Sequence, residues 1–214
     1  MDQRRLLNSV LGYTLALGAG ISGCRQGLAL PLGSNNNVRA AHDATAISWA
    51  ERVESPGLPN LHQVSDDLYR GAQPTAQGMQ RLEALGVRTV INLRTSDTDG
   101  DLLTGSGLTY ERIPMTAWRP KDRDVVRFLQ IVANADRQPV FIHCRRGADR
   151  TGMMVAVYRI AVQGWEKEQA VAEMTQGGFR FNSGWRNLVQ YLRDLDVDAI
   201  RQQAGLELAS SSLR

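Results

Sequence analysis

The spacing of apolar residues predicts a series of short strands and helices in the last two thirds of the chain. Residues 67–70 predict a first strand, and the turn after it leads into a helix that Thr75 caps and that closes near Gly86. Residues 87–93 predict a buried strand, because four of the seven are Val, Ile or Leu and one is a β-branched Thr. Residues 108–113 predict the next strand.

The rest of the chain predicts one more strand and several helices. A helix begins at Asp122 or Asp124 and runs through Ala135, with apolar residues along one face. Residues 139–142 (Pro-Val-Phe-Ile) are apolar throughout, which is typical of a central strand covered on both faces. Further helices are predicted over residues 151–163, 166–176 and 185–203.

Strands that alternate with helices in this way predict an α/β fold, a single domain whose largely parallel central sheet is flanked by helices. We place the domain at residues 66–205, followed by a flexible tail over 206–214. The segment before it, residues 25–65, is rich in Gly, Ser, Asn, Pro and Ala, which predicts a linker. Within that linker, residues 45–53 are expected to form a short helix.

Residues 1–24 have the layout of a secretory signal: two arginines near the start, then a mostly apolar stretch. The stretch ends in Ile-Ser-Gly-Cys, which resembles the lipobox of bacterial lipoproteins, so Cys24 is predicted to carry a lipid that anchors the protein to a membrane. The expected location is the bacterial cell envelope, on the periplasmic side. Two alternatives remain: an ordinary signal peptide with Cys24 near its cleavage site, and an apolar start without a targeting role.

Composition sets limits on the function. The 214 residues are 43% hydrophobic and carry a net charge of +3, which fits one domain with a respectable core. A small net charge without a basic stripe gives no indication of nucleic-acid binding. The two cysteines, Cys24 and Cys144, each have a chemical role of their own, so no disulfide framework is expected. The oligomeric state is left open.

Residues 143–152, which we call the signature loop, carry the chemistry. Cys144 and Arg150 are separated by five residues, between the buried strand and the start of a helix. Backbone N–H groups there, together with the helix dipole, form a site for a phosphate dianion, and Gly147 allows close approach. The predicted phosphate-binding residues are Arg145, Arg146, Gly147, Ala148, Asp149, Arg150 and Thr151.

The two reactive groups of the loop have complementary roles. The positive surroundings are expected to hold the pKa of Cys144 below its free value of about 8.5, so that a nucleophilic thiolate exists at neutral pH. Arg150 can bind two phosphate oxygens through its planar fork. Thr151 is placed to donate a hydrogen bond to the sulfur, and His143 is interpreted as ordering the loop. No metal site is predicted, because no second His or Cys lies at a suitable spacing.

The run His-Cys-x5-Arg-Thr-Gly resembles the signature of the protein tyrosine phosphatase superfamily. Supporting stretches, including Val-Ile-Asn-Leu-Arg over 90–94 and Gly-Gly-Phe over 177–179, are similar to the bacterial branch of dual-specificity phosphatases, which includes periplasmic tyrosine phosphatases of the TpbA type. The resemblance spans roughly residues 60–180. It implies the cysteine-phosphatase fold, a phosphocysteine intermediate formed on Cys144, and no metal or organic cofactor.

The family usually supplies a proton donor, an aspartic acid on a loop upstream of the signature. Here Trp118 stands about where that aspartate is expected, and Asp122 is the nearest replacement, although it or Asp124 can equally cap the following helix. Asp149, inside the signature loop, is a second candidate for the proton donor. Its alternative role is structural, as a carboxylate of the loop. The catalytic set is therefore Cys144, Arg150 and either Asp122 or Asp149, with Asp122 weakly preferred.

The leading hypothesis for function is a phosphatase that acts on phosphotyrosine in proteins, and also on phosphoserine or phosphothreonine. Arg145 and Arg146 add positive charge to the rim of the pocket, so an inositol-phosphate or phosphoinositide phosphatase with the same chemistry is the alternative. A module that binds phosphate without turnover is the third hypothesis. The expected partner is a phosphorylated protein or an inositol phosphate, with a membrane contact through Cys24 and no nucleic acid.

Overall fold

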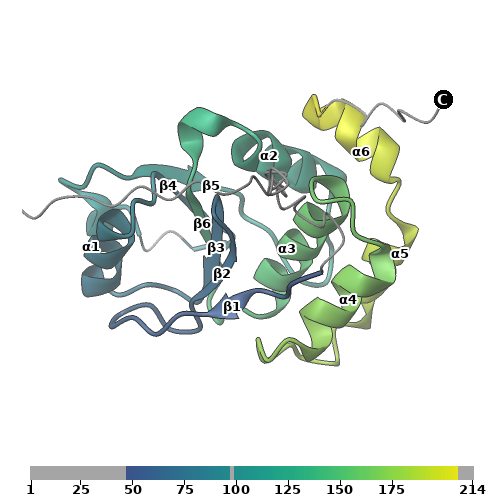
Figure 1. Cartoon of the computed structure of the whole chain (residues 1–214), viewed down its shortest axis with the longest axis horizontal. Coiled ribbons are helices and arrows are strands. Elements are labelled where there is room, and N and C mark those ends of the chain that lie inside the picture. The colour runs from purple at the N-terminus through teal and green to yellow at the C-terminus, as the bar shows by residue number, and fades with distance from the viewer. Residues whose placement is uncertain (1–46, 97–98, 207–214) are drawn as a thin grey trace, which may run out of the picture. The chain divides into compact units, whose positions relative to one another are not determined.

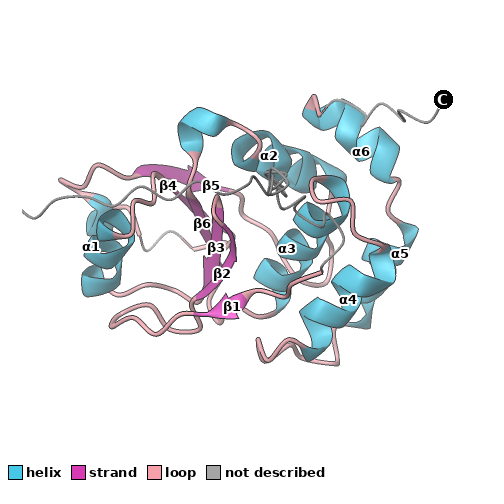
Figure 2. Ribbon diagram, viewed as in Figure 1, coloured by secondary structure: helices cyan, strands magenta, loops and turns pink. Residues whose placement is uncertain are grey.

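The computed structural model describes residues 47–96 and 99–206, and in it a six-stranded sheet is flanked by helices on both faces (Figures 1 and 2). The strands are β1 (Glu51–Arg52), β2 (His62–Ser65), β3 (Leu68–Gly71), β4 (Thr89–Asn92), β5 (Thr109–Arg112) and β6 (Val140–His143). The helices are α1 (Ala76–Ala84), α2 (Asp122–Val132), α3 (Asp149–Ala161), α4 (Lys167–Gln176), α5 (Arg186–Asp194) and α6 (Val197–Ala204), and 3-10 turns lie at Asp101–Leu103 and Ala135–Arg137. None of the helices in these two ranges has the length and apolar character needed to cross a lipid bilayer.

The order of strands in the sheet is β1-β2-β3-β6-β4-β5. The four strands from β3 to β5 run parallel, whereas β1, β2 and β3 pair antiparallel, so the predicted α/β fold with a largely parallel sheet is confirmed. His143, the last residue of β6, is in register with Gly71 of β3 and with Asn92 of β4. The loops that follow these three strands therefore meet at one edge of the sheet, around the signature loop.

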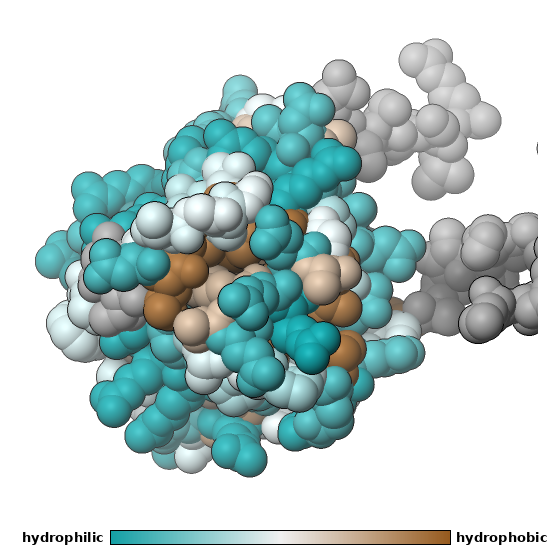
Figure 3. Space-filling view, turned by 90° about the vertical axis from the view of Figure 1, so that its left-hand side faces the viewer, coloured by the Kyte–Doolittle hydropathy of each residue, from teal (hydrophilic) through white to brown (hydrophobic). Residues whose placement is uncertain are grey.

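Two apolar cores hold the layers together. Helix α1 covers one face of the sheet, where Met79 and Leu82 pack with Phe141 of β6. Helices α2 to α6 cover the other face around α3, whose residues from Thr151 to Ala161 are all buried. A helix that is buried all round is apolar on every side, which explains why α3 lacks a polar stripe. On the face seen in Figure 3 polar side chains predominate, and the apolar atoms form small patches near its centre.

The domain begins earlier than residue 66, so the predicted linker over 25–65 is wrong for its last part. Strands β1 and β2 belong to the sheet, and Leu58 and Leu61 are 3% and 1% exposed in the core beneath α1. The expected helix over 45–53 is also wrong, because residues 47–50 have no regular secondary structure and lead into β1. Pro and Gly in this segment form tight turns between short strands, a composition that a flexible linker shares.

Two helix boundaries also differ from the prediction. Thr75 caps α1 as expected, its Oγ1 accepting a hydrogen bond from the Gly78 N–H at 3.2 Å. For α2, however, Lys121 occupies the N-cap position without a side-chain hydrogen bond, and Asp122 lies in the first turn, where its charge favours the helix dipole. The region 185–203 contains two helices, because Asp196 caps α6 by accepting from the Ala199 N–H. Cys24, the predicted signal over 1–24 and residues 207–214 lie outside the described residues.

Candidate active site

The signature loop connects the end of β6 to the first turn of α3, at the edge where the parallel strands end. Cys144 is only 3% exposed, and Ala148 is the N-cap residue of α3. Gly147 has a φ of +68°, and a Cβ there would lie 2.4 Å from the backbone carbonyl of Gly71. Glycine is therefore required at this position for two reasons, the left-handed backbone and the close contact with the end of β3.

Cys144 lies in surroundings that favour its thiolate. Burial raises the pKa of the thiol, but hydrogen bonds from the side chain and backbone of Thr151, the charge of Arg150 and the Arg146 N–H together outweigh burial, so the pKa falls below its usual value. No conventional hydrogen bond within the described residues occupies the buried Thr151 hydroxyl, which leaves it available to the sulfur. The loop thus favours the thiolate form of Cys144, which is the nucleophilic form.

Arg150 is held in place by backbone oxygens. Its Nη1 donates to the carbonyl of Leu93 at 3.2 Å and to the carbonyl of Met115 at 3.3 Å. Leu93 follows β4 and Met115 follows β5, so the guanidinium is fixed by the segments that leave these two neighbouring strands. Within the described residues no partner holds Nε and Nη2, which can therefore bind two oxygens of a phosphate group.

Arg70 of β3 lies behind the loop, fully buried, a residue whose role the sequence did not indicate. Its Nη2 donates to the carbonyls of Gly147 at 2.9 Å and Ala148 at 3.5 Å. Because these carbonyls point toward Arg70, the opposite edge of the loop backbone, with its N–H groups, faces the phosphate site. The guanidinium also lies 3.8 Å from the ring centroid of Phe179, a cation–π contact.

A second buried group supports the loop through His143. Its Nε2 lies 3.0 Å from Oδ2 of Asp99, and both side chains are 0% exposed. Gln73 bridges Oδ1 of Asp99 to Arg94, whose Nη1 donates to Oε1 of Gln73 at 2.6 Å. The interpretation of His143 as a loop-ordering residue fits these contacts. Asp99 itself carries no sequence signal, since it lies 44 residues before His143 in an ordinary polar turn.

A cleft opens in front of the loop. One part, about 200 Å³, is lined by Cys144, Arg145, Arg146, Asp149, Arg150, Asn182 and Trp185. The adjoining part, about 330 Å³, shares Asp149, Arg150 and Trp185 and is lined further by residues 115–118, including Trp118, which is 70% exposed. A phosphate group bound to the loop would therefore leave its organic part between two indole side chains.

The two candidate proton donors differ in position. Asp149 lines both parts of the cleft, and its Oδ1 accepts a hydrogen bond from the Asn182 N–H at 2.8 Å. Asp122 lines neither part, and its Oδ1 accepts a hydrogen bond from Tyr191 Oη at 2.8 Å. Burial and this contact with Asp122 raise the pKa of Tyr191. The structure thus brings Asp149, and not Asp122, to the site of Cys144 and Arg150.

The other predicted phosphate-binding residues are in the loop as expected. Arg145 and Arg146 are exposed at the rim of the cleft, Gly147 and Ala148 are buried, and Thr151 is buried and lowers the pKa of Cys144. Within residues 47–96 and 99–206, no three His, Cys, Asp or Glu side chains are grouped as they would be around a metal ion.

Comparisons with known proteins agree with this geometry. A family model described as a DSP-PTPase phosphatase fused to NAD+ kinase matches residues 46–184. The chain is 39% identical to the dual specificity protein phosphatase TpbA of Pseudomonas aeruginosa strain UCBPP-PA14 over 155 residues, 72% of this chain and 70% of that protein. The inositol diphosphatase DSP5 of Arabidopsis thaliana is 28% identical over 156 residues, 67% of this chain and 73% of that protein.

A solved structure matches as well. The crystal structure of P. aeruginosa TpbA in complex with pTyr superposes with a TM-score of 0.67 at 36% identity, covering 76% of this chain and 99% of that one. Fold, signature loop and sequence similarity extend over the same residues. The chain therefore belongs to the dual-specificity phosphatases of the protein tyrosine phosphatase family.

Proposed function

We propose that this enzyme hydrolyses phosphotyrosine monoesters in proteins through a phosphocysteine intermediate. The observation that carries the proposal is the geometry of the loop, in which the Cys144 sulfur has a lowered pKa, faces the N–H groups of Arg146 and Thr151, and has Arg150 fixed beside it. The indole side chains of Trp118 and Trp185 in the adjoining cleft favour an aromatic leaving group, because aromatic rings stack on one another. The binding of pTyr by the related TpbA supports the same substrate.

The reaction takes place in two steps. In the first, Sγ of Cys144 attacks phosphorus, the bond from phosphorus to the tyrosine oxygen breaks, and phosphocysteine forms. The loop N–H groups and the free edge of Arg150 stabilise the charge on the phosphoryl oxygens as the transition state develops. In the second step, water attacks the phosphocysteine and phosphate is released. The thiolate leaves with help from the hydroxyl of Thr151.

Asp149 is the proton donor in this proposal. One of its oxygens is held by the Asn182 N–H, and the carboxyl group lies in the wall of the cleft beside Arg150. It protonates the leaving phenoxide in the first step, and as a carboxylate it accepts a proton from the attacking water in the second. Asp122, paired with Tyr191 outside the cleft, is the alternative donor.

Cys144→Ser and the two aspartate variants test the proposal. Wild-type enzyme is expected to hydrolyse p-nitrophenyl phosphate and phosphotyrosine peptides in the presence of EDTA, with inhibition by vanadate, and Cys144→Ser is expected to lose all turnover. A donor matters most when the leaving group is poor, so Asp149→Asn should lower kcat on an alkyl phosphate about 10²-fold or more, with a smaller loss on an aryl phosphate. The same pattern in Asp122→Asn, with Asp149→Asn active, would assign the donor to Asp122.

An inositol phosphate is the second candidate substrate. It is favoured by the exposed cations at the rim, Arg145 and Arg146, and by the similarity to a protein named inositol diphosphatase. A panel that contains phosphotyrosine, phosphoserine and phosphothreonine peptides beside soluble inositol phosphates distinguishes the two. A kcat/KM at least tenfold higher on inositol phosphates than on every peptide would replace phosphotyrosine as the substrate.

The location at the cell envelope is part of the proposal and depends on sequence alone. The apolar segment after the two N-terminal arginines and the Ile-Ser-Gly-Cys run support export and lipid attachment at Cys24. In a bacterial host, wild-type protein is expected in the membrane fraction with incorporated radiolabelled fatty acid. Cys24→Ala should lose the label and move to the soluble periplasmic fraction. Unlabelled wild-type protein in the periplasm would instead support a simple signal peptide.

A further inference from the structure

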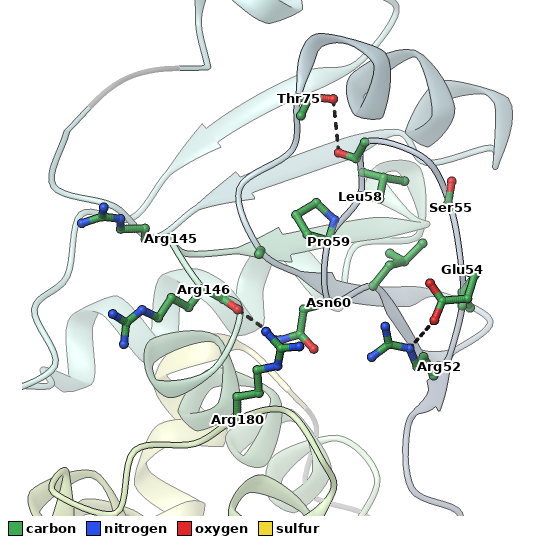
Figure 4. Close-up of a pocket in the computed structure, with 14 residues that line it drawn as sticks. Arg52, Glu54, Ser55, Leu58, Pro59, Asn60, Thr75, Arg145, Arg146 and Arg180 are labelled. Carbon is green, nitrogen blue, oxygen red and sulfur yellow. Dashed lines mark hydrogen bonds and ion pairs between the residues drawn. The ribbon is translucent and has the colours of Figure 1, made fainter.

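A second cavity lies beside the catalytic cleft, on the other side of the signature loop (Figure 4). It measures about 820 Å³ and reaches from the segment before β2 to Arg145, Arg146 and Arg180. We call it the arginine groove. Its floor includes the buried side chains of Leu58 and Leu61. None of the chemistry described above uses this cavity.

Side-chain hydrogen bonds fix the backbone that lines the arginine groove at its end near the signature loop. Nδ2 of Asn60 donates to the carbonyl of Arg146 at 3.1 Å and to the carbonyl of Phe179 at 3.3 Å, so one amide joins the two segments that carry the arginines. Among the described residues, Asn60 and Arg180 are the two non-glycine residues with positive φ, at 56° and 66°. Asparagine tolerates this conformation, but arginine adopts it at a cost, and such strain is concentrated at functional sites.

The charge of the arginine groove is unbalanced at the same end. Arg145, Arg146 and Arg180 are exposed, and within the described residues no carboxylate forms an ion pair with any of them. At the far end Arg52 pairs with Glu54 at 2.5 Å, which leaves that part neutral. In Figure 4 the guanidinium of Arg180 lies beside Asn60 at the cavity, whereas those of Arg145 and Arg146 extend outward from the loop. Arg180 therefore supplies the charge that faces the cavity, and the two loop arginines add to the positive field at its mouth, which attracts an anion.

The arginine groove and the catalytic cleft share Arg145 and Arg146 in their walls. A ligand whose phosphate group lies on Cys144 can therefore place a second anionic group in the groove. The apolar floor and the neutral far end, where Glu54 is paired with Arg52, offer no positive charge to further anionic groups, which disfavours a ligand that is charged on all sides, such as an inositol polyphosphate. These features suit an acidic side chain, which has a methylene stem for the apolar floor and a single negative charge. In a peptide, such a side chain can stand next to the phosphotyrosine.

We propose that the arginine groove binds an acidic side chain next to the phosphotyrosine of the substrate, and so selects phosphopeptides with Asp or Glu at a flanking position. This inference builds on the proposed phosphotyrosine activity. In this proposal Arg180 recognises the substrate through its charge and does not touch the reacting atoms. Asn60 is a positioning residue, because it holds the two arginine-bearing segments together without a charge of its own.

The test measures kcat/KM for phosphotyrosine peptides that differ only in flanking residues, acidic in one and neutral in the other, beside p-nitrophenyl phosphate and inositol hexakisphosphate. Wild-type enzyme is expected to prefer the acidic peptide roughly fivefold, the upper range for an exposed ion pair. The preference should reside in KM, since binding is equal in the ground and transition states, and it should shrink as salt is raised.

Two variants at Arg180 separate charge from folding. Arg180→Gly removes the guanidinium and suits the positive φ, so the fold is expected to remain intact while the preference for the acidic peptide disappears. Arg180→Lys keeps the charge and should retain most of the preference. The matched control is Arg88→Glu, at the opposite end of the parallel strands, which should leave every rate unchanged.

The outcomes are distinct. Equal rates on the two peptides, or an acidic preference that survives Arg180→Gly, would overturn the arginine groove as a recognition site while phosphotyrosine activity stands. Hydrolysis of inositol hexakisphosphate that depends on Arg180, with neither peptide turned over, would overturn both the peptide occupant and the proposed function. Turnover of p-nitrophenyl phosphate alone would reject both proposals as well.

Discussion

Arg70 carries a charge that works against the stability of the fold. Burial lowers its pKa to about 10, and the negative charges of Glu173 and Cys144 only partly oppose the shift. A base whose pKa falls on folding destabilises the folded state at every pH below that lowered pKa, and the loss disappears only as the pH rises above about 10 toward the ordinary pKa of an arginine. Two of its nitrogens, Nε and Nη1, also lack hydrogen-bond partners among the described residues. The presence of this costly buried charge is explained by the hydrogen bonds that Arg70 donates to the signature loop.

Arg70→Met should therefore separate activity from stability. The free energy of unfolding is expected to stay within about 1 kcal/mol of wild type, because an apolar side chain of similar volume replaces a poorly satisfied charge. Phosphate affinity and kcat/KM should fall roughly tenfold or more, since the carbonyls of Gly147 and Ala148 lose their donor. Urea titrations, vanadate inhibition and kinetics measure the three quantities. Parallel losses of stability and activity would show that Arg70 is merely structural.

The hydroxyl of Thr151 should set the pH dependence of catalysis. The thiolate is the active form, and kcat/KM of the free enzyme falls on the acid side as Cys144 becomes protonated. Thr151→Val removes a hydrogen bond that lowers the pKa of Cys144, so the acid limb of the profile should move to higher pH. Thr151→Ser keeps the hydroxyl and should keep the limb in place. An unmoved limb in Thr151→Val would contradict the assigned contact.

At the scale of elements, α4 makes two ion pairs that look alike in sequence but differ in burial. Glu173 pairs with Arg159 of α3 at 2.6 Å, with both side chains at most 3% exposed, and also accepts from the Ala50 N–H at 2.7 Å. Glu168 pairs with Arg193 of α5 at 2.8 Å on the surface. The buried pair thus joins α3, α4 and the segment leading into β1, whereas the exposed pair joins two helices that also pack through apolar residues.

Glu173→Gln should destabilise the domain by roughly 3 kcal/mol, because it leaves Arg159 buried without a counter-charge. Glu168→Gln, one turn and a half earlier on the same helix, is the matched control and should leave the unfolding midpoint unchanged, since both partners are solvated. Denaturant unfolding followed by circular dichroism measures both. Equal midpoints for the two variants would mean that α3 and α4 are held together by apolar packing alone.

How far an element could be predicted from sequence depended on the range of its contacts. Cys144 and Arg150 lie in one continuous loop, so their roles follow from local order along the chain. Arg70 and Asp99 contact that loop although they lie 77 and 44 residues before their partners in it. An arginine in a strand or an aspartate in a turn gives no sequence signal for a contact with so distant a partner. Strand β1, of two residues, is too short for alternation to reveal, and only pairing with β2 defines it.

For the whole molecule, the corrected start of the domain leads to a truncation experiment. A chain that begins at Ile47 contains every described element and is expected to fold, with a cooperative thermal transition and activity on p-nitrophenyl phosphate. A chain that begins at Asp66 lacks β1, β2 and the buried Leu58 and Leu61, so it should be insoluble or unfolded. A soluble, active chain from Asp66 would restore the linker that the sequence suggested.

The lowered pKa of Cys144 also has a redox consequence. A thiolate at neutral pH reacts with peroxides to give a sulfenic acid, and an enzyme can reverse this safely when a nearby thiol captures the product as a disulfide. Cys144 is the one free cysteine in the described part of the chain, and it lies 3% exposed at the bottom of its loop. Within the described residues no second thiol can capture the oxidised sulfur, so a small external thiol that fits the catalytic cleft is a route to its rescue. The feature that makes the enzyme a phosphatase thus ties its activity to the oxidants and reductants around it.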